Sequence, residues 1–368
     1  MKKFLSLLLA LTMVFALAAC GSKEADTPAP EPETAAPSTA EPAPAEPAAQ
    51  PDETPAEPAP AEPAEPGEET PDEPAASGEH YTVGICQLVT HDALDAATQG
   101  FQDALNEKLP GQVTFDYQNA ANDPATCATI ANSFVSANVD LIMANATPAL
   151  QAAATATADI PVLGTSVTEY GVAMGIDNFS GTVGGNISGT SDLAPLDQQA
   201  AMIQEWYPDA KKVGLLYCSN EANSQYQVDT VMAELEKMGY SCTQFSFSDS
   251  NDIAAVCQSA ADNSDILYVP TDNTVASNTP IIDNICHGKI PVFAGEEGIC
   301  AGCGVATLSI SYYDLGYQTG VMAAEILTGE ADISTMPVAY APNFVQKYNP
   351  AVCEALGVTV PDGYEAIQ

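Results

Sequence analysis

The chain is constrained most by a repeated alternation of short apolar runs with longer segments of helical periodicity. Residues 81–88, 113–117 and 141–144 are such apolar runs, and the segments between them place apolar side chains at helical spacing. A strand–helix–strand rhythm gives a parallel sheet covered by helices on both faces. A glycine-rich stretch at 181–189 interrupts the rhythm, which then restarts and runs to residue 293. The sequence therefore predicts an α/β fold with two doubly wound parallel-sheet lobes and a ligand cleft between them.

The lobe boundaries follow from the point at which the chain returns from the second lobe to the first. An amphipathic helix at 312–329, ended by Gly329, comes after the second set of strands and is expected to pack on the first lobe. We therefore expect the first lobe to comprise residues 81–188 and 295–332, and the second to comprise residues 189–294 and 333–368.

The N-terminal region predicts export and anchoring. Residues 1–19 combine two lysines with an apolar run too short for a comfortable membrane span, which is typical of a signal peptide. The sequence Leu-Ala-Ala-Cys at its end resembles a bacterial lipobox, so Cys20 is the expected lipid anchor; an ordinary signal peptide with an incidental cysteine is the alternative. Residues 20–80 are rich in Pro, Glu and Ala and are expected to form a disordered tether. No other segment is long and apolar enough to span a bilayer.

Charge restricts the possible partners. The chain has 49 acidic and 9 basic residues, a formal net charge of −40, which argues against nucleic acid and anionic lipid as partners. All the bases are lysines. Without arginine, a carboxylate ligand cannot be held by a guanidinium fork, so hydroxyls and helix N-termini must bind it.

Two strand-to-helix corners offer polar side chains where a ligand could bind. Residues 266–269 form an apolar run that is followed by Pro270 and a polar Thr-Asp-Asn-Thr sequence, where a helix should begin. Residues 141–144 are followed in the same way by Asn145, Thr147 and a proline. In open parallel sheets such strand ends border the ligand crevice.

Several segments together resemble the ABC-transporter substrate-binding lipoproteins of the tryptophan/tyrosine type. The resemblance runs from about residue 81 to the C-terminus. It is carried by LVTHDALDA (88–96), DYQNA (116–120), ATP (146–148), VGLLY (213–217), SNEANS (219–224), YVPTDNTVAS (268–277), IPVFAGE (290–296) and YYDLGYQTG (312–320). It implies a type I periplasmic-binding-protein fold that closes on a small solute, with an aromatic amino acid as the leading ligand class, and delivers it to an ABC permease and its ATPase.

The site residues are chosen for the chemistry of a zwitterionic amino acid. Hydroxyls and helix-terminal amides would bind its carboxylate, and acidic or amide oxygens would accept from its ammonium. Thr168 is a further hydroxyl. The expected ligand-binding residues are Thr90, His91, Thr147, Thr165, Ser166, Glu221, Asn223, Asp272, Asn273 and Glu296.

Each choice has a plainer alternative. Thr147, Asp272 and Asn273 are residue types that often do no more than cap a helix. Glu221 and Glu296 are as compatible with solvated loop acids, and His91 with a residue next to a cap. For the ligand's side chain, the aromatic candidates are Tyr170, Tyr226, Tyr312 and Tyr313, although tyrosines at helical spacing more often belong to a core.

The cysteines indicate free thiols rather than a framework of disulfide bonds. Cys20 apart, nine remain, mostly within apolar strands and helices. Cys300 and Cys303 have a spacing found in metal and redox sites, but no second pair of this kind accompanies them, so the signal is weak. The alternative to free thiols at these two positions is one loop disulfide between them.

Nothing in the sequence points to catalysis. It has no nucleophile elbow, no Walker loop and no His-Glu-x-x-His motif, so neither an enzyme nor a bound cofactor or metal is expected. The sequence predicts a monomeric solute-binding protein held on the extracytoplasmic face of the cell membrane by its lipid alone. A ligand sensor that presents the bound solute to a membrane receptor is the alternative.

Overall fold

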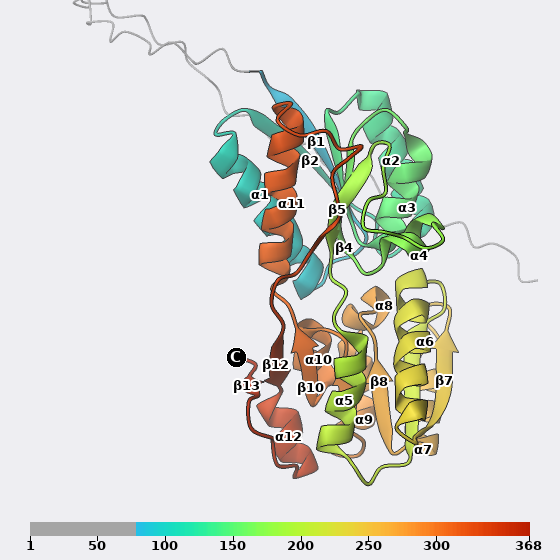
Figure 1. Ribbon diagram of the computed structural model, residues 1–368. Coiled ribbons are helices and arrows are strands. Elements are labelled where there is room, and N and C mark those ends of the chain that lie inside the picture. The colour runs from blue at the N-terminus through green and yellow to red at the C-terminus, as the bar shows by residue number, and fades with distance from the viewer. Residues whose placement is uncertain (1–78) are drawn as a thin grey trace, which may run out of the picture. The chain divides into compact units, whose positions relative to one another are not determined.

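The computed structural model describes residues 79–368 (Figure 1). The expected signal peptide, Cys20 and nearly all of the expected tether lie outside the described residues. Among the described residues, no helix is long and apolar enough to cross a membrane.

The first lobe is built on a six-stranded parallel sheet with the strand order β11-β5-β4-β3-β1-β2. Its strands are β1 (Tyr81–Gln87), β2 (Val113–Asn119), β3 (Leu141–Asn145), β4 (Val162–Val167), β5 (Ile187–Ser191) and β11 (Ala339–Tyr340). Its helices are α1 (Asp92–Lys108), α2 (Pro124–Ala137), α3 (Thr147–Ala156), α4 (Tyr170–Met174) and α11 (Tyr312–Leu327).

The second lobe is built on a seven-stranded sheet with the order β13-β12-β10-β9-β8-β6-β7, parallel except where β10 pairs with β12. Its strands are β6 (Lys212–Cys218), β7 (Ser241–Phe247), β8 (Ile266–Val269), β9 (Val292–Ala294), β10 (Ala306–Ser309), β12 (Val345–Tyr348) and β13 (Glu365–Ala366). Its helices are α5 (Leu196–Trp206), α6 (Ala222–Lys237), α7 (Ile253–Asn263), α8 (Asn273–Ala276), α9 (Thr279–Cys286), α10 (Glu297–Cys303) and α12 (Pro350–Leu356).

Each sheet is covered by helices on both faces. In the first lobe, α1 and α11 pack on one face, and α2 and α3 on the other (Figure 1). In the second lobe, α5, α6 and α12 share one core with the sheet, and α7, α9 and α10 share the other. The alternation of buried side chains along β6 and β8 supplies both cores, as a strand covered on both faces requires. The predicted α/β class with two doubly wound lobes is confirmed.

The lobe boundaries differ from the sequence-based ones at two places. Residues 295–309 were assigned to the first lobe, but α10 and β10 belong to the second, because β10 pairs with β9 in the register Ala306↔Phe293. Gly295, expected as the exit from the lobe, instead leads into α10. Likewise β11 pairs with β5 of the first sheet, so the last crossing falls after Tyr340 rather than near residue 333.

The residues that follow the Thr-Asp-Asn-Thr sequence form two short helices rather than one continuous helix. Helix α8 ends at Ala276, and α9 begins at Thr279 with Pro280 in its first turn. A proline is favourable there and unfavourable inside a continuous helix, which explains the break.

Helices α1 and α11 pack unusually closely. A side chain at Gly100 would collide with the carbonyl of Tyr313, and one at Gly316 would collide with the carbonyl of Ala97. These two helices are far apart in the sequence, and they close one face of the first sheet together.

Candidate functional site

Parallel strands bring their following loops to one edge of each sheet. In the first lobe, the register Asn145↔Thr165 and Val167↔Ser191 aligns the carboxyl ends of β3, β4 and β5. The residues that follow these three strands therefore lie next to one another. In the second lobe, β6, β8 and β9 end in the same way beside α6, α8 and α10.

Thr147 begins α3 at the first of these corners. The residue before it, Ala146, has a φ of 89°, and no side chain caps the helix. Thr147 is 2% exposed, and its Oγ1 has no hydrogen-bond partner among the described residues. A buried hydroxyl beside uncapped amides is a costly arrangement unless something else binds there. Asn145 supports the corner, because its Nδ2 donates to Leu94 O (2.8 Å) and Thr98 Oγ1 (3.0 Å).

Thr165 and Ser166, two expected ligand-binding residues near the end of β4, have different surroundings. Ser166 has a φ of 54° at a register shift, and its buried Oγ has no partner within the described chain. Strained backbone at a strand end is found most often at binding sites. Thr165 is instead engaged: its Oγ1 lies 3.1 Å from Thr190 Oγ1, which lies 2.8 Å from Thr319 Oγ1. This chain of hydroxyls ties the sheet to α11, so Thr165 has a structural role in this conformation.

Asp192 was missed by the sequence analysis. It follows β5 directly and is 4% exposed; its Oδ2 accepts from the Tyr312 hydroxyl (3.0 Å), and its Oδ1 has no partner in the described part of the chain. Burial raises the pKa of Asp192, and the hydroxyls of Tyr312 and Thr168 partly offset this. The sequence before it, Ile-Ser-Gly-Thr-Ser, lacks an apolar run, so the strand was not recognised. An acid directly after Thr-Ser in a glycine-rich stretch was the available signal.

The opposite corner, β8 to α8, uses its acids internally. Both Asp272 oxygens are engaged, one by the amide of Val275 (2.9 Å) and the other by the amide of Cys218 (2.7 Å). Burial, with the charge of Glu221 nearby, raises the pKa of Asp272. Glu221 accepts from the amides of Asn273 (3.0 Å) and Thr274 (2.9 Å) and from both of their side chains. The helix-capping alternative thus describes the observed contacts of Asp272, and Glu221 is a buried support rather than a solvated acid.

Asn223 combines support with a free acceptor. Its Nδ2 donates to Thr271 O (3.0 Å) and, more weakly, to Glu221 Oε2 (3.3 Å). Its Oδ1 is buried and unpartnered within the described residues. Because it lies in the first turn of α6, this oxygen is held rigidly beside the β8–α8 corner.

Glu296 caps α10. Its oxygens accept from the amides of Gly298 (2.6 Å) and Ile299 (2.5 Å), and the residue is 3% exposed. Burial raises the pKa of Glu296 to about 7, although the two amides act in the opposite direction. The charge of Asp192 further raises the pKa of Glu296, and the charge of Glu296 contributes to raising the pKa of Tyr312, so the three groups lie near one another.

The lobes are linked beside these corners. His91 Nε2 lies 3.2 Å from Asn273 Oδ1, and Asn122 Nδ2 donates to Thr274 Oγ1 (2.9 Å). Thr90 is exposed, and its Oγ1 accepts from Asn119 (3.2 Å). A cleft of about 490 Å³ is lined by Thr90, His91 and Glu296, with residues of α8 and α10 opposite.

The four aromatic candidates have different surroundings. The Tyr170 ring is buried, and its hydroxyl donates to Thr190 O (3.1 Å), so it belongs to the core. Tyr313 is 40% exposed and donates to Asp103. Tyr226 is half-buried with Glu169 nearby. Tyr312 alone of the four contacts the site, through Asp192.

Four of the unpartnered buried polar atoms in the described part of the chain belong to residues at these strand ends and helix starts, namely Thr147, Ser166, Asp192 and Asn223. Asp192 contacts Tyr312, Tyr312 lies near Thr271, and Thr271 is held by Asn223, which connects the lobes through one buried polar path. Thr147 and Ser166 lie beside Asp192 at adjacent strand ends. Native proteins leave few buried polar atoms unpaired. Two hydroxyls and two acceptor oxygens of this kind, drawn from both lobes, match the needs of a small polar ligand with both an anionic and a cationic group.

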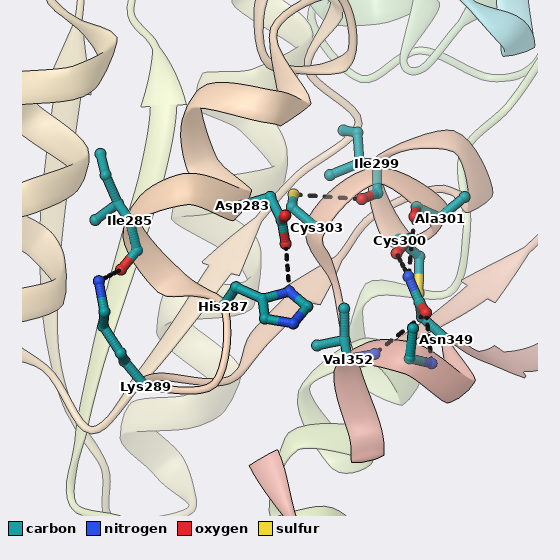
Figure 2. Close-up of polar contacts among 11 residues, drawn as sticks. Asp283, Ile285, His287, Lys289, Ile299, Cys300, Ala301, Cys303, Asn349 and Val352 are labelled. Atoms are coloured by element: carbon teal, nitrogen blue, oxygen red, sulfur yellow. Dashed lines mark hydrogen bonds and ion pairs between the residues drawn. The ribbon is translucent and has the colours of Figure 1, made fainter. Parts of the chain in front are cut away.

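Cys300 and Cys303, considered above for a loop disulfide, are not bridged. Both are buried free thiols on α10, and Cys303 Sγ donates to Ile299 O (Figure 2). Asn349 ties the same helix to α12 through the Cys300 and Ala301 carbonyls (Figure 2). No group of three or more potential metal ligands occurs among the described residues.

Comparison with known proteins agrees with this architecture. Residues 82–366 match the family described as ABC transporter substrate binding protein. A protein named "Tyrosine-binding protein" from Clostridioides difficile is 39% identical over 266 residues, which are 71% of this chain and 76% of that protein.

Two solved structures extend the comparison. A complex with L-Trp from Streptococcus pneumonia is 32% identical with a TM-score of 0.74, and it covers 78% of this chain and 100% of its own. A ligand-free, open substrate-binding protein with adhesive properties from Clostridium difficile is 38% identical with a TM-score of 0.61, and it covers 78% of this chain and 99% of its own. With its two-lobed type I periplasmic-binding-protein fold, the chain belongs to the ABC-transporter substrate-binding protein family.

Proposed function

We propose that this substrate-binding protein captures an aromatic L-amino acid, with tyrosine and tryptophan as first candidates, and delivers it without chemical change to an ABC permease and its ATPase. The observation that carries the proposal is a group of four buried polar atoms at strand ends and helix starts that have no partner among the described residues, namely Thr147 Oγ1, Ser166 Oγ, Asp192 Oδ1 and Asn223 Oδ1. The names of a tyrosine-binding relative and of an L-Trp complex support the ligand class.

The ligand carboxylate is placed at Thr147 and Ser166. The uncapped first turn of α3 supplies positive partial charge there, which a chain without arginine needs. The ammonium is placed at Asp192 and Asn223, with Glu296 adding negative charge nearby. The proposed role of Glu221, Asp272 and Asn273 is to hold the second-lobe wall in place, while Thr90 and His91 border the cleft and Thr165 fixes the strand end.

A ligand series tests both halves of the site. Calorimetry on the chain should show binding of L-Trp and L-Tyr. Tryptamine, which lacks the carboxylate, and N-acetyl-L-tryptophan, which lacks the ammonium, should each bind roughly a hundredfold more weakly or worse, because buried partners are left unpaired. Recovery of the amino acid unchanged checks that no turnover occurs. Equal binding of tryptamine and L-Trp would refute the carboxylate site.

We further propose that the mature protein is a lipoprotein monomer anchored at Cys20. The basis is the lipobox-like Leu-Ala-Ala-Cys sequence and the Pro/Glu/Ala-rich segment behind it. Mass spectrometry of the N-terminal peptide from membranes should find a diacylglyceryl group on Cys20, and Cys20→Ala should release the protein from the membrane. An unmodified Cys20 in the membrane fraction would contradict the anchor.

A further inference from the structure

The second lobe contains a thiol pair that solute binding does not use. Cys257 on α7 and Cys286, the last residue of α9, are both fully buried, and their sulfur atoms lie 3.8 Å apart. They belong to one core with three further cysteines, Cys218, Cys300 and Cys303. The two residues are 29 positions apart in the chain, so their proximity results from the fold.

The packing allows these sulfurs to approach further. Helices α7 and α9 contact each other along the outer layer of the second lobe. A disulfide bond is about 2.05 Å long, so the sulfurs need to close by a little under about 2 Å, within the reach of side-chain rotation and a small helix shift. Two of the other thiols in this core have acceptors of their own, since Cys303 donates to Ile299 O and Cys218 to Ser248 O.

We propose that Cys257 and Cys286 are an oxidation site at which a peroxide forms a reversible disulfide between α7 and α9. One thiol loses its proton, and the thiolate attacks hydrogen peroxide; the O–O bond breaks, the sulfur becomes a sulfenic acid, and the departing hydroxide takes up that proton to give the first water. The second thiol displaces the hydroxyl as a second water, and the S–S bond forms. In total the two thiols lose two hydrogen atoms, and one peroxide is reduced to two waters. A substrate-binding protein works outside the cytoplasm, where the glutathione and thioredoxin systems do not keep thiols reduced.

The position of the link gives it a consequence. The segment between Cys257 and Cys286 contains β8 and α8, and hence Asp272 and Asn273. A bond that closes this loop restricts the unfolded chain and holds the β8–α8 corner between two joined helices. Oxidation should therefore raise the melting temperature of the protein by a few degrees. Burial of both thiols makes the reaction slow, and denaturant concentrations below the unfolding transition should accelerate it.

The experiment maps thiols on the full chain before and after hydrogen peroxide. The protein is denatured, alkylated, digested and analysed by mass spectrometry, and its melting temperature is measured in parallel. Expected is a peptide joining Cys257 to Cys286, lighter than the two free peptides by two hydrogen atoms and lost on treatment with a reductant. Cys257→Ala and Cys286→Ala should each abolish both the linked peptide and the rise in melting temperature.

A matched control is Cys86→Ala. This removes a buried thiol of the first lobe, where the contact with Cys127 and then burial raise the pKa of Cys86. The Cys257–Cys286 link should form in this variant as in the natural chain. The proposal is overturned if both thiols remain open to alkylation after peroxide, or if each is oxidised separately to a sulfinic acid with no linked peptide. Because the mapping is done on the natural chain, a variant that fails to fold leaves the test intact.

Discussion

Replacing Asp192 by asparagine tests the ammonium site most directly. The substitution keeps the size of the side chain and an oxygen that can accept from Tyr312, and it removes the charge. Among the described residues, Oδ2 has a partner and Oδ1 has none, so a ligand at Oδ1 would lose one buried charge-assisted contact. Such a contact contributes about 2–4 kcal/mol, and Kd for L-Trp should rise from roughly 30-fold to several hundredfold.

The effect on the ligand-free protein should have the opposite sign. Burial raises the pKa of Asp192, which means that its charged form is unfavourable in the folded state. An asparagine amide does not carry that cost. The melting temperature of Asp192→Asn without ligand should therefore equal or exceed that of the natural chain at pH 8. A simple structural role for Asp192 predicts a fall in both affinity and melting temperature.

Titration calorimetry and thermal unfolding at pH 8 provide the two measurements. The control is Asp197→Asn, which makes the same charge change at an exposed position in the first turn of α5. It should leave Kd within about twofold, because an exposed charge is screened by solvent. Unaltered affinity in Asp192→Asn, or equal losses in the two variants, would refute the ammonium assignment.

Three other outcomes follow from the same contacts. Thr147→Val should weaken L-Trp binding by about 1–3 kcal/mol in calorimetry. It should not lower the stability of the ligand-free protein, because Oγ1 has no partner to lose among the described residues. A loss of stability with normal affinity would show that the carboxylate binds elsewhere. Asp272→Asn should lower the free energy of unfolding by about 1–3 kcal/mol in denaturant titration, because an amide nitrogen then faces the N–H of Cys218 or Val275. Its affinity for L-Trp should change little. A large loss of affinity at normal stability would show that Asp272 contacts the ligand. Burial raises the pKa of Glu296 from 4.5 to about 7, so the folded state binds more protons in that window. The stability of the ligand-free natural chain should fall as pH rises from 4.5 to 7, and that of Glu296→Gln should fall less. The affinity of the natural chain for the ligand's ammonium should rise over the same range. Equal slopes of stability against pH in the two proteins would exclude Glu296 as the source of the pH dependence.

The overall fold was predictable because periodicity is local. The apolar runs at β1, β3, β6 and β8 are covered on both faces, and their sequences show it. Strand β5 was not recognised because its sequence, Ile-Ser-Gly-Thr-Ser, is polar and yet fully buried. Its hydroxyls are satisfied by partners far away in the sequence, such as Thr319 on α11, and no local pattern reports such a partner.

Within the site, the residue types predicted where the polar side chains lie better than they predicted what each side chain does. The chosen residues do lie at strand ends, as the parallel topology requires. Whether an acid is free or engaged depends on which amides the fold brings to it, and the engagement of Glu221 by Asn273 and Thr274 joins residues more than fifty positions apart. Asp192 and Asp272 have the same chemistry and similar burial, and only their partners distinguish them.

The close packing of α1 against α11 bears on how the molecule is made. The first lobe is discontinuous: the face of its sheet covered by α1 is completed only by a helix that begins at Tyr312. While the chain emerges from the ribosome and crosses the membrane, residues 81–191 therefore expose an unfinished apolar face until α11 has followed, after most of the second lobe. Contacts of such long sequence separation form late and slowly. The glycines Gly100 and Gly316, which permit that late docking, are thus positions where substitution should delay maturation and favour aggregation during export.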